Sequence, residues 1–215
     1  MPTLDSLGTL LEAELKDIYD AERQISKALP RIMKRATAPE LREALQEHLQ
    51  QTEQQIERLE EAFDQLELPH RGKKCLGMQN LLKEGDETMR EVEDSATRDA
   101  LIVAAAQKVE HYEIASYGTL RTWANLLGHE DVAALFSETL DEEKDTDRRL
   151  TAIAESFVNA SAAEADDEDE EIEASSSSAP GRRGRAGGAA HVSRPVVADR
   201  GTQRKRTRGA ASRSR

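Results

Sequence analysis

The sequence predicts an all-α protein, a four-helix bundle followed by a disordered C-terminal tail. Apolar residues recur at three- and four-residue intervals through most of the first 160 residues, which is typical of amphipathic helices. No stretch shows the alternation of a half-buried strand. After residue 160 the pattern stops, and acidic, serine, glycine and arginine residues dominate. We therefore expect one helical domain over residues 1–160 and a disordered tail over residues 161–215.

The first two helices are predicted over residues 6–35 and from residue 39 to about Leu66. Each carries a single apolar stripe, which marks the face to be buried. Between them, Thr37-Ala-Pro-Glu40 has the pattern of a capping box, in which the threonine and glutamate side chains cap the helix start reciprocally, and proline suits a first turn. The short connection predicts an antiparallel hairpin.

A second hairpin is predicted from two further helices, Ser95–Leu127 and Asp131–Asn159. Gly128 between them is expected to end the first of the two as a C-cap glycine. Residues 73–94 form a long connection between the hairpins, with a short helix expected near Gln79–Arg90. Two antiparallel hairpins joined by a long crossover are the arrangement of ferritin-like bundles.

Composition excludes several classes of protein. The single cysteine, Cys75, rules out an intramolecular disulfide and a cysteine-based metal site. The N-terminus has no basic flank followed by an apolar run, and no window approaches the roughly 20 apolar residues of a membrane helix. No phosphate loop, dinucleotide fingerprint or nucleophile–base pair is recognisable. We expect a soluble, cytoplasmic protein.

Polar residues on the apolar stripes are the candidates for chemistry in a bundle. Folding each hairpin about its turn sets Glu22 level with residue 53, and Glu110 level with Asp147. His48 and Glu143 then lie within about one and a half turns of these positions. Because buried carboxylates are costly without a partner, a bound divalent cation would stabilise such a group. The predicted metal ligands are Glu22, His48, Glu110, Glu143 and Asp147.

A purely structural role, in which ion pairs or bound protons neutralise these inward carboxylates, is an alternative of equal weight. Lysine and arginine side chains on the same helices could neutralise them without any metal. The available partners are Arg58, Arg121, Lys144 and Arg149.

Several segments carry a resemblance to a known family. They are residues 14–24, 48–59, 74–78 with Glu84 and Gly85, 107–118, and 140–144 with Asp147. Together they resemble the YciF/YciE-type ferritin-like proteins over residues 4–157. The resemblance implies a bacterial ferritin-like bundle, usually a homodimer, that is linked to stress responses and has no established reaction.

The wider ferritin-like superfamily implies two metal ions, held by single glutamates on the first and third helices and by Glu-x-x-His on the second and fourth. Glu22 and Glu110 occupy the single-glutamate positions. The paired motifs depart from the pattern, because the second helix reads Thr52-x-x-Gln55 and the fourth reads Glu143-x-x-Thr146. We therefore expect one metal, or a weakened pair. Iron is favoured, manganese and zinc are alternatives, and a bundle without metal is the structural alternative.

The first functional hypothesis is a metal-binding stress protein, whose bound metal would handle iron or react with peroxide or oxygen at open coordination positions. The tail supports a different hypothesis, a non-catalytic bundle that binds DNA or another polyanion. Residues 1–160 hold 19 Lys+Arg and 33 Asp+Glu, the run at 164–173 is acidic, and residues 174–215 hold 11 Lys+Arg and one Asp. The candidate nucleic-acid contacts are Arg182, Arg183, Arg185, Arg204, Lys205, Arg206 and Arg208. In a third reading, the basic segment at 181–215 pairs internally with the acidic parts of the chain.

If the basic segment contacts DNA, binding will be weak, independent of base sequence and strongly reduced by salt, because phosphate contacts release counterions. Full-length protein should therefore shift DNA in a gel at low salt, while a 1–160 truncation should not. Equal retention of DNA by both proteins would contradict a role for the tail.

Overall fold

The structure is a computed structural model that describes residues 4–165. Within this range the chain forms five α-helices and one π-helical turn, without any strand. The prediction of an all-α bundle is confirmed. The elements are α1 (Leu7–Met33), α2 (Pro39–Gln65), α3 (Leu76–Glu91), α4 (Ser95–Leu126), α5 (Glu130–Ile153) and the π-helix η1 (Ala154–Val158).

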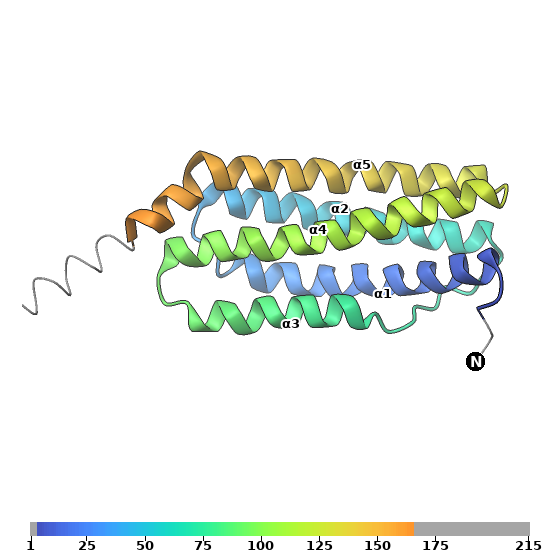
Figure 1. Ribbon diagram of the computed structural model, residues 1–215, viewed down its shortest axis with the longest axis horizontal. Coiled ribbons are helices and arrows are strands. Elements are labelled where there is room, and N and C mark those ends of the chain that lie inside the picture. The colour runs from blue at the N-terminus through green and yellow to red at the C-terminus, as the bar shows by residue number, and fades with distance from the viewer. Residues whose placement is uncertain (1–3, 166–215) are drawn as a thin grey trace, which may run out of the picture. The chain divides into compact units, whose positions relative to one another are not determined.

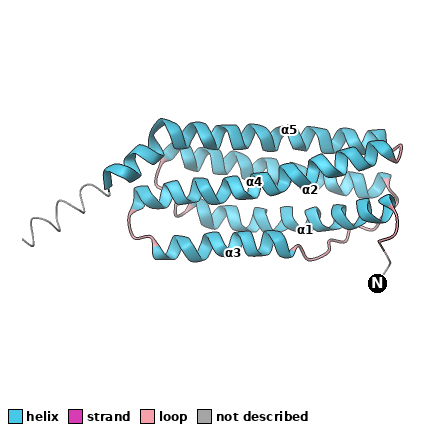
Figure 2. Ribbon diagram, in the orientation of Figure 1, coloured by secondary structure: helices cyan, strands magenta, loops and turns pink. Residues whose placement is uncertain are grey.

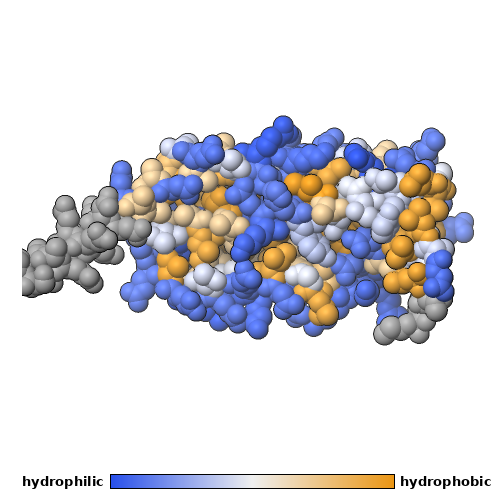
Figure 3. All heavy atoms as spheres, viewed as in Figure 1, coloured by the Kyte–Doolittle hydropathy of each residue, from blue (hydrophilic) through white to orange (hydrophobic). Residues whose placement is uncertain are grey.

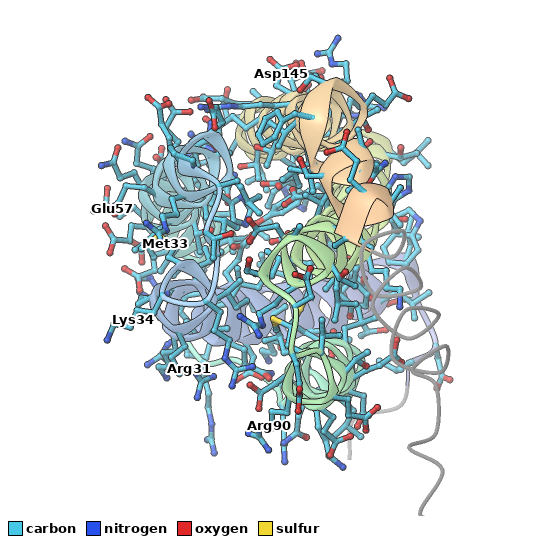
Figure 4. The ribbon with its side chains drawn as sticks, turned by 90° about the vertical axis from the view of Figure 1, so that its left-hand side faces the viewer. Arg31, Met33, Lys34, Glu57, Arg90 and Asp145 are labelled. Carbon is cyan, nitrogen blue, oxygen red and sulfur yellow. The ribbon has the colours of Figure 1, made fainter. Side chains whose placement is uncertain are left out.

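Four long helices surround the interior of the bundle (Figure 1, Figure 2). The hairpins α1–α2 and α4–α5 pack face to face, with α1 against α4 and α2 against α5. The third helix is the crossover helix, and it packs outside this ring against α1 and α4. Viewed along the bundle, charged side chains such as Glu57, Arg90 and Asp145 point away from the interior (Figure 4).

Helix α4 has apolar residues on several faces, whereas α1 and α2 each have one apolar stripe. The difference follows from position, because α4 contacts α1, α3 and α5. A helix with neighbours on three sides needs apolar or small residues toward each of them. Its alanine-rich early part, residues 104–106, faces α3 closely, since a Cβ on Gly85 of α3 would lie 3.3 Å from the Cβ of Ala105.

The start of α2 differs from the prediction. The capping box expected at Thr37–Glu40 is wrong, since Ala38 is the N-cap residue and no side chain of the helix caps it. The cap comes instead from the buried Asp99 of α4. Its carboxylate accepts hydrogen bonds from the backbone N–H groups of Thr37 (2.8 Å) and Ala38 (2.7 Å) and from the Thr37 hydroxyl (2.6 Å). Pro39 occupies the first turn, as predicted.

The turn between α4 and α5 matches the prediction for Gly128. This residue has a φ of +83°, a conformation that favours glycine. The backbone N–H of Gly128 donates to the Asn125 carbonyl at 3.1 Å, and the backbone N–H of the next residue, His129, donates to the Ala124 carbonyl at 2.9 Å. These bonds satisfy carbonyls at the end of α4 and reverse the chain.

The segment before α3 is tied to α1 and α4 by buried polar contacts. The backbone N–H of Cys75 donates to the Asp20 carboxylate at 2.8 Å, and the Cys75 carbonyl accepts from the Gln24 amide at 3.0 Å. The Cys75 Sγ lies 3.1 Å from the Tyr112 hydroxyl, which donates to Asp17 at 2.7 Å. The helix itself begins at Leu76, three residues before the expected start at Gln79.

The C-terminal end of the bundle extends beyond the expected boundary. The last helix was predicted to end at Asn159 and the domain at residue 160, but the chain passes through η1 and remains helical to residue 165. Val158 in η1 is buried, so this turn belongs to the packed core. The remainder of the predicted disordered tail lies outside the described residues.

The surface is mostly hydrophilic on the face shown in Figure 3, with hydrophobic residues gathered at the end where α1 begins and α4 ends. Large hydrophobic side chains at this end that are exposed include Leu4 and Leu126. They are candidates for a contact between chains, and the expected homodimer stays a prediction. Among residues 4–165, no helix has the length and apolar character needed to cross a membrane.

We expect Asp99→Ala to lower the free energy of unfolding by about 2–3 kcal/mol, because it removes a charged acceptor and leaves two backbone N–H groups at the start of α2 without their partner. Urea unfolding measures this change. The matched control is Asp141→Ala, at an exposed site on α5, where the change should stay within about 0.5 kcal/mol. Equal effects of the two substitutions would contradict the proposed cap.

Candidate metal centre

Five ionisable side chains lie buried near the middle of the bundle, and four of them are glutamates. They come from four different helices: Glu22 on α1, His48 on α2, Glu110 and Glu113 on α4, and Glu143 on α5. None is more than 4 % exposed. We call these residues the carboxylate cluster. The two α4 members are three residues apart, so helical geometry places them on the same face.

The cluster contains two overlapping groups of three. In one, His48, Glu110 and Glu113 each offer one ligand atom, and these atoms lie within 4.8 Å of one another. In the other, Glu22, Glu113 and Glu143 meet the same criterion. Glu113 belongs to both groups, so its carboxylate lies at the centre of the arrangement.

A few polar neighbours orient the cluster. The Tyr117 hydroxyl donates to Glu22 Oε1 at 2.6 Å, and the Gln55 amide donates to Glu143 and, at 3.0 Å, to Glu142. His48 Nδ1 lies 3.6 Å from Glu110 Oε1, which is too long for a good hydrogen bond. These contacts fix one oxygen of Glu22 and one of Glu143, and leave the rest of the cluster free to bind something else.

Many ligand-type atoms of the cluster have no hydrogen-bond partner within the described residues. They are Glu22 Oε2, His48 Nδ1, Glu110 Oε2, both carboxylate oxygens of Glu113, and Glu143 Oε2. Nearby, Thr52 Oγ1 and Gln55 Oε1 are also buried without a partner. Such atoms are rare in proteins, since each one costs free energy unless an ion, a proton or water satisfies it.

Basic side chains of residues 4–165 form no direct ion pair with the cluster, although the charge of Arg58 lowers the pKa values of Glu22 and Glu143 in part. Arg58, the nearest candidate, pairs with Glu142, donating to its Oε2 at 2.8 Å, and lies 3.3 Å from Glu138. Lys144 pairs with Asp141 on the surface, and Arg149 pairs with Glu47. No ion pair joins any lysine or arginine of the described chain to a cluster glutamate, so the structural alternative rests on protonation of the glutamates and not on ion pairs.

Burial shifts the protonation of every member of the cluster toward its neutral form. Desolvation, together with the nearby Glu143, raises the pKa of Glu22 from 4.5 to about 8. Desolvation is also the main cause that raises the pKa of Glu143 to about 7, and it raises the pKa values of Glu110 and Glu113 well above the usual range. It lowers the pKa of His48 to about 4. Without a cation, the cluster holds extra protons at neutral pH.

The structure brings four of the five sequence-predicted ligands together and separates the fifth. Asp147 lies at the seam between α4 and α5, where its carboxylate accepts from Gln107 at 3.0 Å and is 3.4 Å from His111 Nε2. The inward residue on this turn is Thr146, which is 9 % exposed. The candidate nucleic-acid residues between Arg182 and Arg208 lie outside the described residues.

Glu113 is the member that sequence reasoning missed. It is absent from the ligands predicted from the sequence, yet it is fully buried at the centre of the cluster. A signal was available, because Glu110, Glu113 and Tyr117 follow the spacing i, i+3, i+7 that marks one helix face. The mixed apolar pattern of α4 concealed which face points inward.

The residues present fit a divalent metal. The unpartnered atoms are carboxylate oxygens and one imidazole nitrogen, the donor set that suits iron, manganese or zinc. Glu22 and Glu110 keep the single-glutamate positions, and Glu113 adds a carboxylate that compensates for the missing Glu-x-x-His residues. A cation would also lower the raised pKa values, because positive charge favours ionised carboxylates.

The fold and the site define a ferritin-like helical bundle with a buried carboxylate cluster at its centre. The chain belongs to the family described as "Domain of unknown function (DUF892)", which matches residues 6–163. It is 44 % identical over 149 residues to Protein YciF of Escherichia coli (strain K12), covering 69 % of this chain and 90 % of that protein. The resemblance inferred from the motifs is confirmed.

Solved structures agree with this assignment. The crystal structure of the E. coli stress protein YciF matches with a TM-score of 0.70 at 41 % identity, covering 73 % of this chain and 99 % of that chain. The structure of YcfI from Rhodopseudomonas palustris matches with a TM-score of 0.68 at 44 % identity, covering 70 % of this chain and 98 % of that chain. These matches confirm the ferritin-like bundle.

We expect the free energy of unfolding of the metal-free protein to fall as the pH rises from about 6.5 to about 8. Folded Glu22 keeps its proton up to about pH 8, whereas an unfolded glutamate loses it near pH 4.5, so deprotonation in this range disfavours the folded state. His48 acts in the opposite sense, but only between about pH 4 and its ordinary 6.5. Urea unfolding in a chelator at several pH values measures the slope.

Glu22→Gln should flatten this decline, because glutamine cannot titrate. Glu57→Gln, at an exposed position on α2, should leave the slope of the parent unchanged. An unfolding free energy that rises between pH 6.5 and 8 would show that the cluster is ionised and stabilised in the metal-free protein.

Proposed function

We propose that this protein is a metal-binding stress protein that holds divalent metal, iron in the first place, in the carboxylate cluster. The observation that supports the proposal most directly is the set of buried glutamate and histidine atoms without hydrogen-bond partners among the described residues. Oxygen-rich sites with one imidazole suit iron and manganese. A stress role is supported by the E. coli relative, which is described as a stress protein.

The two overlapping groups support a site for a pair of ions. His48 and Glu110 would serve one ion, Glu22 and Glu143 the other, and Glu113 would be available to both. Bound iron would supply electron exchange with an oxidant such as peroxide or oxygen, through coordination positions that the protein leaves open. This role would connect the cluster to oxidative stress or to iron handling.

The chain's own residues hold the donor atoms in place. Tyr117 donates to Glu22, and Gln55 donates to Glu143 while it also contacts Glu142, which Arg58 binds. Such outer contacts orient ligands and tune their basicity. The surrounding apolar core excludes water, which strengthens the attraction between carboxylates and a cation.

The proposal predicts that Glu113→Gln removes more metal than any other single glutamine substitution in the cluster. Glu113 belongs to both groups, so its loss weakens both positions, whereas Glu22→Gln weakens only the group that contains Glu143. Elemental analysis of untagged full-length protein after incubation with ferrous iron, and separately with manganese and zinc, measures the number of ions per chain.

Glu57→Gln serves as the control, since it makes the same chemical change on an exposed face of α2. Circular dichroism of each variant checks that the helices are intact. Absence of stoichiometric metal from the parent, or equal metal in the parent and in folded Glu113→Gln, would show that the cluster is structural.

A further inference from the structure

A small apolar cavity lies directly beside the carboxylate cluster. Its volume is about 40 Å³, and residues of α1, α2, α3 and α4 line it. Only two of its lining residues are polar, and both of them, His48 and Glu110, belong to the cluster. The remaining walls are leucine, isoleucine, valine, methionine, alanine and glycine. The cavity therefore joins an apolar chamber to one of the two groups of candidate ligands.

The cavity reaches from the buried interior toward the seam between α3 and α4. Its inner walls include Ile25 and Ile102, which are fully buried, and its outer walls include Gly85 and Ala106, which are partly exposed. Small side chains on both sides of the seam let the two helices approach closely there. The lining residues thus define an apolar route from the cluster toward this seam.

The roof over this route is held in a fixed position. Helix α3 is anchored at its start through the contacts of Cys75 with Asp20 and Gln24. A Cβ added at Gly77 would lie 2.9 Å from the Tyr112 ring, so the first turn of α3 is packed tightly against α4. Because the roof is anchored, the space below it is a built feature of the bundle.

Size and polarity limit what can occupy the cavity. A dry cavity of about 150 Å³ accommodates benzene, so a chamber of about 40 Å³ is restricted to molecules of a few heavy atoms. Water needs two to four polar partners, and the walls offer them only at the end formed by His48 and Glu110. Hydrogen peroxide would lose most of its hydrogen bonds on entering. A diatomic apolar molecule loses none.

We propose that this cavity binds dioxygen and holds it beside Glu110 and His48. Its use as an oxidant there rests on the proposed metal site, but binding in the cavity does not require metal. The proposal assigns α3 the role of forming the roof of a gas-binding chamber, and it favours dioxygen over peroxide as the molecule that reaches the cluster by this route.

Methyl NMR of metal-free, full-length protein under oxygen pressure tests the proposal, with nitrogen at equal pressure as the diamagnetic reference. Dissolved dioxygen is paramagnetic, so it broadens the signals of nearby methyl groups. We expect several-fold greater broadening for Ile25 and Ile102, which line the cavity, than for Leu120 and Val132, which are equally buried elsewhere in the core. Equal broadening at both sets would overturn the proposal.

Filling the cavity should remove the effect. Ala106→Leu places a larger side chain in its wall, and Ala104→Leu makes the same change two residues away on the exposed face of α4. We expect the selective broadening to disappear only in Ala106→Leu. If that variant does not fold, Gly85→Ala narrows the same seam by one methyl group, and Gly118→Ala is its control, because a Cβ there meets nothing within 4 Å. Selective broadening that persists in the folded filling variant would also overturn the proposal.

The outcome separates this inference from the proposed metal site. Selective broadening in a protein that binds no metal would support dioxygen binding in the cavity and would rule out its use as an oxidant at a metal site there. Stoichiometric metal without selective broadening would retain the metal site and exclude this cavity as the route for dioxygen.

Discussion

The burial of four glutamates in the middle of a helical bundle is the constraint on which the rest of this structure depends. Each carboxylate is withdrawn from water, and no lysine or arginine of residues 4–165 forms an ion pair with it, the nearby Arg58 being paired with Glu142. In a medium of low dielectric constant, four such groups repel one another unless protons or cations are present. The apolar layers above and below them must therefore supply enough hydrophobic stabilisation to keep the bundle closed over a polar centre.

The helices of the bundle have different roles in meeting this constraint. The hairpins α1–α2 and α4–α5 provide the ligand-type atoms, while α3 provides none and covers the seam between α1 and α4. Helix α4 carries two members of the cluster and also packs against α3, which explains its apolar residues on several faces. Polar contacts that do not touch the cluster, such as the hydrogen bond from the Cys75 N–H to Asp20, hold the start of the covering helix.

Periodicity was enough to predict the bundle, its two hairpins and its crossover, because each long helix buries a continuous stripe. It also placed Glu22, His48, Glu110 and Glu143 inside. It failed where the answer depends on contacts between distant segments. The face of α4 that carries Glu113 is defined by three neighbours, and a single step along α5 separates the buried Thr146 from Asp147 at the seam. The cap of α2 was misassigned to Thr37 because a local pattern cannot reveal an acceptor 62 residues away.

That distant acceptor has a consequence for how the chain is made. During synthesis, α1 and α2 leave the ribosome well before Asp99, so the start of α2 emerges without its cap. The first hairpin can form helical turns early, but its connection acquires its final hydrogen bonds only after α4 has been translated and has docked. Contacts between residues so far apart in the sequence slow folding, because the chain between them must first be brought together. The connection between α1 and α2 is therefore synthesised early but acquires its final structure late. The carboxylate cluster is likewise assembled only when both hairpins have formed and docked.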